Sequence, residues 1–193
     1  MTVTGRLWYA GQNYSGEANN GAASTGVVAG FVTTPYECTS NANSSLHDRR
    51  VVMVAPWSSN GSVAGAHILD DQGVIHYCGY SEGYGKNVGI TNSGDPATST
   101  LVEGEDVVNS VLMRDAATTM NSDNQRVVSL WASGARYGAK YAITDGGDSG
   151  EPKVYTTGYN YYAAGGVGQQ NLSDPTVLGN VSNYPLTWAE LQF

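Results

Sequence analysis

A serine set between glycines is the residue of this sequence best placed to do chemistry. Ser149 lies in the segment Gly-Asp-Ser-Gly-Glu-Pro, residues 147–152. A serine hydroxyl becomes a nucleophile when a neighbouring base accepts its proton and backbone N–H groups hold the oxyanion that forms. The segment therefore predicts acyl-transfer chemistry only if the fold also brings a histidine, oriented by a carboxylate, to Ser149.

The segment around Ser149 resembles the nucleophile loop of chymotrypsin-like serine proteases, whose pattern is Gly-Asp-Ser-Gly-Gly-Pro. Weaker similarity extends downstream to residues 164–167 and 175–188. Upstream, Val-Ala-Gly-Ala-His at 63–67 is similar to the segment that carries the general base in that family. The resemblance implies a serine hydrolase with Ser149 as nucleophile and His67 as base.

The orienting carboxylate of such a triad is missing from its expected place. With His67 as base, the matching position carries Ser110, and the stretch from there to Ser149 is too short for a second six-stranded barrel. The alternative set of His47, Asp70 and Ser149 has better spacing, but His47 lies in a charged segment. We therefore predict that the Ser149 segment is a turn and that the protein is not an enzyme, with the serine hydrolase as the alternative.

The remaining titratable residues form no metal-binding pattern. His67 and His76 lie on the two strands of a predicted hairpin, where they could approach each other, but no third ligand accompanies them. The acidic cluster at 103–106 lacks the regular spacing of a calcium loop. We predict hydrogen-bonded strand histidines, no metal and no cofactor, and the sequence leaves open whether Cys38 and Cys78 pair.

Tyrosines gather in two segments, around residues 77–84 and 155–162. Tyrosine offers a rigid amphipathic contact surface, and the surrounding Gly, Ser and Asn supply adaptable hydrogen bonds. Such a composition is typical of recognition surfaces, although alternate strand tyrosines also pack in cores. We predict a receptor-binding surface that includes Tyr84, Tyr159 and Tyr161, with structural packing as the alternative.

Composition excludes several classes of partner. The 193 residues carry a net charge of −8, and only 13% of them are charged, about half the globular average of roughly 25%. A net negative chain does not suit a nucleic-acid backbone, so we predict no nucleic-acid partner. No run of 18 apolar residues occurs, so we predict no membrane insertion.

Abundant Val, Thr, Tyr and Gly predict an all-β fold, an antiparallel barrel or sandwich with long polar loops and little helix. The clearest hairpin spans 66–77, where two apolar runs flank an Asp/Gly turn. Residues 107–119 could instead form a short helix, and no internal repeat is apparent. The predicted strands are 3–10, 26–34, 50–57, 63–69, 74–78, 106–113, 126–132, 140–144, 153–157, 176–181 and 186–192.

The opening strand Val-Thr-Gly-Arg-Leu-Trp-Tyr (3–9) and the overall composition resemble the projecting spike of a non-enveloped RNA virus capsid, most like that of avian astrovirus coat proteins. The resemblance implies one spike domain over residues 1–193, excised from a larger chain and displayed on the virion surface. It implies a homodimer, contact with the rest of the capsid, and attachment to a host-cell receptor, with a glycan as the expected class. A secreted carbohydrate-binding module is a further alternative.

Overall fold

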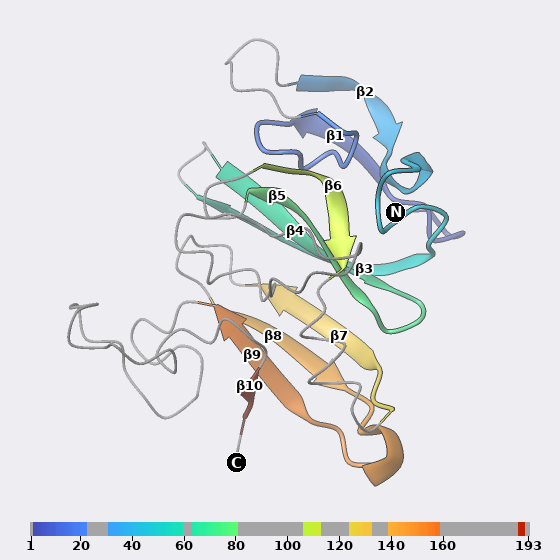
Figure 1. Ribbon diagram of the computed structural model, residues 1–193, viewed down its shortest axis with the longest axis vertical. Coiled ribbons are helices and arrows are strands. Elements are labelled where there is room, and N and C mark those ends of the chain that lie inside the picture. Colours follow the sequence, from blue (N-terminus) through green and yellow to red (C-terminus); the bar gives the residue numbers. More distant parts are fainter. Residues whose placement is uncertain are drawn as a thin grey trace, which may run out of the picture.

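The computed structural model describes residues 2–22, 31–59, 63–80, 106–112, 124–132, 139–158 and 189–191. These ranges contain ten strands and two short 3-10 turns (Figure 1). No helix within them is long and apolar enough to cross a membrane. The strands are β1 (Trp8–Gln12), β2 (Phe31–Glu37), β3 (Val51–Ser59), β4 (Val63–Asp70), β5 (Ile75–Tyr80), β6 (Asp106–Leu112), β7 (Val127–Ala132), β8 (Ala139–Thr144), β9 (Val154–Gly158) and β10 (Ala189–Glu190).

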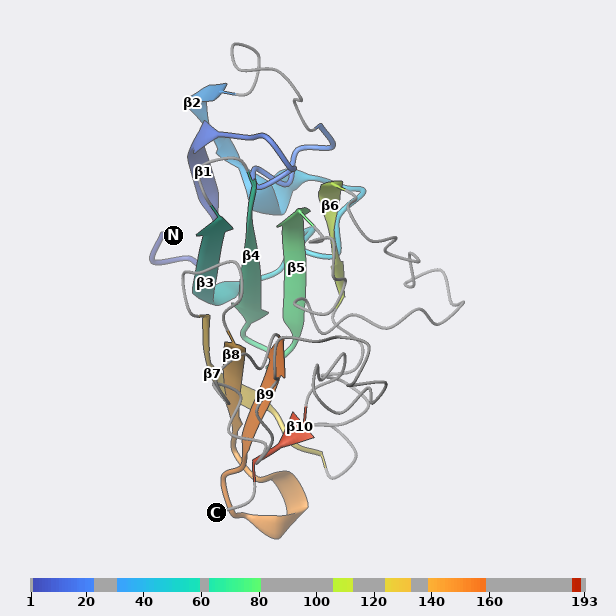
Figure 2. The ribbon, with the colours of Figure 1, turned by 90° about the vertical axis from the view of Figure 1, so that its left-hand side faces the viewer.

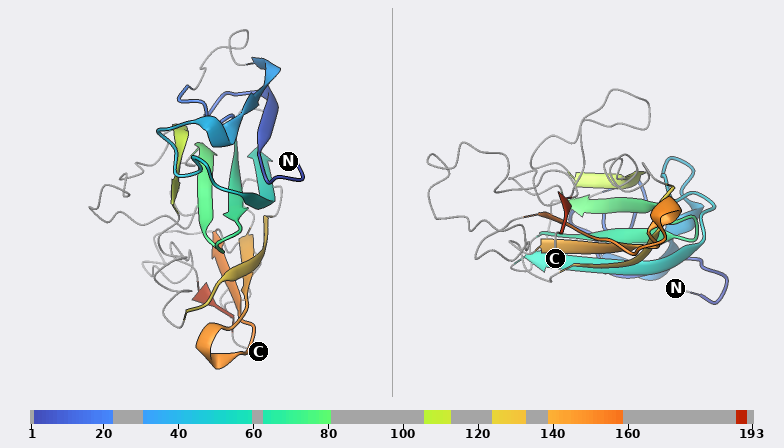
Figure 3. Two further views of the ribbon diagram at one scale, coloured as in Figure 1. Left: turned by 90° about the vertical axis from the view of Figure 1, so that its right-hand side faces the viewer. Right: turned by 90° about the horizontal axis from the view of Figure 1, so that it is seen from below.

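The strands form three antiparallel sheets that follow one another along the long axis of the molecule. A two-stranded sheet has the order β1-β2, a central sheet β3-β4-β5-β6 and a third sheet β10-β9-β8-β7. The central sheet lies between the other two (Figure 2, Figure 3). The predicted all-β class with antiparallel sheets is confirmed.

Most predicted strands agree with the structure, and the differences have local causes. The 66–77 hairpin is confirmed as β4–β5, whose turn places Gly73 at φ +76°. The helical alternative for 107–119 is wrong over 107–112, because β6 pairs with β5 there. The first strand starts only at Trp8, since Gly5 at φ +79° closes a turn that bonds its N–H to Thr2 O. The predicted strand 176–181 lies outside the described residues.

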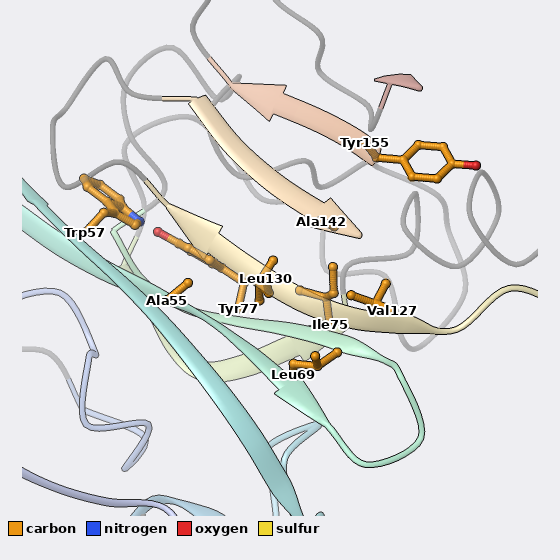
Figure 4. Close-up of a cluster of buried hydrophobic side chains, with 9 residues drawn as sticks. All are labelled: Ala55, Trp57, Leu69, Ile75, Tyr77, Val127, Leu130, Ala142 and Tyr155. Carbon is orange, nitrogen blue, oxygen red and sulfur yellow. The ribbon is translucent and has the colours of Figure 1, made fainter. Parts of the chain in front are cut away.

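The main hydrophobic core lies between the central and third sheets. Tyr77 and Ile75 of β5 and Trp57 of β3 pack there with Leu130 of β7 and Tyr155 of β9 (Figure 4). A smaller cluster lies on the opposite face of the central sheet, toward β1, and contains Leu46, Val51, Ile68 and Cys78. Strand β5 is therefore covered on both faces, which explains why it is almost wholly inaccessible to solvent.

Two strands repeat one sequence pattern, and a third shares with them an apolar first residue, an aromatic residue and the final glycine. The segments are Leu-Trp-Tyr-Ala-Gly (7–11), which begins one residue before β1, Ile-His-Tyr-Cys-Gly (75–79) in β5 and Val-Tyr-Thr-Thr-Gly (154–158) in β9. The first two share a register shift just before the final glycine, and both glycines have positive φ, +129° at Gly11 and +106° at Gly79. The hydroxyls of Tyr9 and Tyr77 each donate to the carbonyl three residues later.

The strand order repeats with the sequence pattern. β3 and β4 precede β5 in the central sheet as β7 and β8 precede β9 in the third sheet. β3 and β7 both begin Val-Val and carry a register shift directly after the first valine, between Val51 and Met53 and between Val127 and Ser129. The central and third sheets therefore repeat one structural unit, a four-stranded antiparallel meander.

Candidate functional site

Ser149 lies in an exposed 3-10 turn between β8 and β9. Gly146, Gly147 and Gly150 all have positive φ, and the Ser149 hydroxyl donates to Gly146 O at 2.7 Å. The described residues bring no imidazole to this hydroxyl. The Nδ1 atom of His47, one of the predicted bases, lies 3.6 Å from Asp48 Oδ2 instead. The predicted turn is confirmed, and Ser149 lacks the hydrogen-bonded base that a nucleophile requires.

The predicted pair of histidines is separated by the pleat of the hairpin. His67 is opposite Tyr77 and His76 is opposite Ile68, so the two imidazoles lie on different faces of the sheet. The His67 ring packs 5.0 Å from the Tyr77 ring. Within the described ranges, no group of three metal-ligating side chains occurs. The predicted receptor residues Tyr84, Tyr159 and Tyr161 lie outside the described residues.

A hydrogen-bonded chain joins the half-buried Ser45 to the buried side chains of His76 and Asp70. Ser45 Oγ lies 2.8 Å from His76 Nδ1, and His76 Nε2 lies 3.2 Å from Asp70 Oδ2. Because a carboxylate only accepts hydrogen bonds, Nε2 carries the proton and Nδ1 accepts from the serine hydroxyl. His76 is therefore a hydrogen-bonded strand histidine, as predicted, and it ties the 41–50 loop to the central sheet.

Asp70 is the anchor of this chain. Its Oδ1 also accepts the backbone N–H groups of Gln72 and Val74, and Arg49 lies 3.6 Å from Oδ2. Burial by itself raises the pKa of the Asp70 carboxyl, but the hydrogen bonds from His76, Val74 and Gln72 outweigh it and hold the pKa below its ordinary value. Sequence reasoning missed this cluster because Ser45 is 31 residues from His76, with no local motif.

A pocket of about 800 Å³ lies between β1 and the face of the central sheet formed by β3 and β4. Its wall is mostly apolar, and it reaches the surface beside Trp8 and Val52, which are 45% and 43% exposed. Of the described residues that line the pocket, Glu17 alone carries a charged side chain. The lining residues are Leu7, Trp8, Tyr9, Glu17, Cys38, Val52, Met53, Val54, Pro56, Trp57, Ser58, Ala64, Gly65, Ala66, Ile68 and Cys78.

The inner wall of the pocket holds weak acids that stay protonated. Cys38 and Cys78 are both buried and free, so they do not pair. Burial is the main cause that raises the pKa of Cys38 to about 12, and burial also raises the pKa of Cys78. Burial and then the Glu17 carboxylate raise the pKa of Tyr9 to about 12. These groups are neutral near pH 7, and the thiols are poor nucleophiles.

The comparisons with known proteins give a fold and no function. No family model matches the sequence, and no curated protein matches it. Among solved structures, the fold is similar to that of human WBSCR16, with a TM-score of 0.54 over 96% of this chain and 13% sequence identity. The match spans 37% of the WBSCR16 chain. At this identity the likeness shows a shared fold alone.

Proposed function

We propose that this chain is a binding module that holds the apolar part of a partner in the pocket between β1 and strands β3 and β4. The observation that carries the proposal is the pocket itself, about 800 Å³ with an apolar wall and few polar groups. Ligand sites in proteins are typically concave and apolar, with a few polar groups that fix orientation. With Glu17 in the wall and a net charge of −8, the pocket favours neutral or cationic partners.

Attachment to a host-cell receptor from a virion surface stays a prediction, as do the homodimer, the capsid contact and the absence of nucleic-acid and membrane partners. Binding is the element that this prediction shares with the pocket. An apolar wall suits an apolar side chain or ring better than a glycan, whose many hydroxyl groups need hydrogen-bond partners. The pocket therefore favours a protein receptor over the predicted glycan.

A neutral apolar dye tests the binding proposal. N-phenyl-1-naphthylamine should fluoresce on binding to the wild-type protein, and Ala64→Trp, which places an indole in the pocket wall, should weaken binding about tenfold. The matched control is Val128→Trp on β7, 54% exposed and outside the pocket, which should leave dye affinity unchanged. Absence of dye binding, or equal weakening by both variants, would contradict the proposal.

Acyl transfer at Ser45 is a second candidate function, favoured by its hydrogen bond to a carboxylate-oriented imidazole. Ser45 Oγ would attack an acyl carbonyl while its proton passes to His76 Nδ1, and the leaving group would take that proton. A fluorophosphonate probe should then label the wild-type protein and not Ser45→Ala, while Ser149→Ala should be labelled like the wild type. Absence of label in the folded wild-type protein would exclude the nucleophile.

A further inference from the structure

The three sheets differ in the number of strands that flank β1, β5 and β9. In the central sheet β5 has a strand on each side, β4 and β6, and in the third sheet β9 lies between β8 and β10. Their counterpart β1 pairs only with β2 in the part of the chain that the structure describes. Within the described residues, the first sheet therefore contains counterparts of the third and fourth strands of the unit and no counterpart of the first and second.

The pocket lies where counterparts of the first and second strands of the unit would pack. In the complete pair of sheets, the first strand of the lower unit, β7, packs against β3 and β4 of the unit above it. By the same stacking, the first strand of the upper unit would pack on the opposite face of β3, and that face supplies much of the pocket wall through Val52, Val54 and Pro56.

The exposure of β3 agrees with this reading. Leu130 of β7 is buried under the central sheet, whereas its counterpart Val54 is only partly buried and lines the pocket. Val51 begins β3 as Val127 begins β7. It is buried in the smaller cluster, where it packs with Leu46 of the 41–50 loop. The apolar side chains of β3 are therefore suited to a covering sheet that the described residues supply only in part.

We propose that the pocket is the docking site of a β-hairpin from another polypeptide, which pairs with the edge of β1 that no described strand occupies and covers β3. This inference rests on the proposed function and names its partner: an extended polypeptide with alternating apolar residues and no net negative charge. Main-chain hydrogen bonds to an exposed strand edge supply affinity in such complexes, and pockets for alternate side chains supply specificity. Repeated four-stranded units stacked face to face are also how β-propellers are built, where each unit needs its full set of strands.

The hairpin β7–β8 of this chain is the natural probe, because it occupies the corresponding place in the repeat. A synthetic peptide of residues 127–144 carries Arg136 and Lys140 and no acidic residue, which suits the Glu17 side of the pocket. The peptide should displace N-phenyl-1-naphthylamine from the wild-type protein. A control peptide with Leu130→Pro and Ala142→Pro cannot complete the strand hydrogen bonds. Its affinity should be lower by about tenfold or more.

A direct readout of strand pairing completes the test. Isotope-edited infrared spectra of the peptide, labelled with ¹³C carbonyls, should show the β-sheet band only in the presence of the protein, and Ala64→Trp should abolish it. Dye binding without displacement by the peptide would overturn the hairpin and leave the proposed function standing. Absence of dye binding would overturn both. A dimer by light scattering whose dissociation frees the dye site would overturn the hairpin in favour of a second copy.

Discussion

Replacing Asp70 with alanine is expected to lower the free energy of unfolding by about 3–5 kcal/mol, because the change leaves several buried donors without an acceptor. The carboxylate accepts from His76 Nε2 and from the backbone N–H groups of Gln72 and Val74, and its side chain is wholly buried. Loss of the β4–β5 turn would also free the His76 contact with Ser45. Urea denaturation followed by tryptophan fluorescence measures the change.

Asp71→Ala is the matched control for that change, since Asp71 is the next residue and exposed. Its unfolding free energy should stay within about 0.5 kcal/mol of the wild type. The Asp70 contribution should also depend on pH. Because the folded pKa lies below the unfolded value, the stabilisation is complete above the unfolded pKa and is lost as the pH falls through the folded pKa. Equal destabilisation by Asp70→Ala and Asp71→Ala would contradict this account. So would a difference in unfolding free energy between the wild type and an Asp70→Asn variant that persists at the lowest pH.

Gly79→Ala is expected to cost more than about 4 kcal/mol or to prevent folding, because the backbone and the neighbouring strand both exclude a side chain there. Gly79 has φ +106°, and a methyl group would lie 2.5 Å from Ala64 O and nearer still to Gly65 Cα. Both contacts are with the backbone of β4, which cannot move without breaking its pairing with β3 and β5. Circular dichroism and the yield of soluble protein report the outcome.

Gly150→Ala separates steric overlap from backbone strain. Gly150 also has positive φ, +70°, but a methyl group there would meet no atom within 4 Å. It should cost only the strain of the left-handed conformation, about 1–2 kcal/mol. If the two variants lost the same stability, the close approach of β4 and β5 would not be the reason for glycine at position 79.

The fold class was predictable because β-branched and aromatic residues suit pleated sheets whatever the order of the strands. The β4–β5 hairpin was predictable because its turn residues and its apolar runs are adjacent in sequence. β2 was predicted only in part, since it contains Pro35, which is tolerated in an edge strand but weakens the sequence signal. The repeated strand order is not apparent in the sequence because the units share little more than a glycine, an aromatic residue and apolar positions.

The candidate site could not be predicted from short sequence motifs. Ser149 has the flanking residues of a protease nucleophile, yet among the described residues its hydroxyl forms hydrogen bonds only within its own turn. Ser45 has no motif, yet the fold brings it to an oriented imidazole, because the 41–50 loop crosses the face of β5. The pocket depends on the spacing between two sheets, and that spacing follows from which strands each sheet contains. Contacts of this kind become visible only when the topology is known.

The middle sheet has neighbours above and below, whereas each outer sheet has one described neighbour. Free energy for local opening should then fall from the centre of the molecule toward both ends, since an outer layer can separate without exposing a second interface. The amides of β4 and β5 would be the last to exchange with deuterium, and the two-stranded layer the first to become accessible to a protease. A layer with this low local stability is also the one whose completion by another polypeptide would most increase the cooperativity of the whole stack.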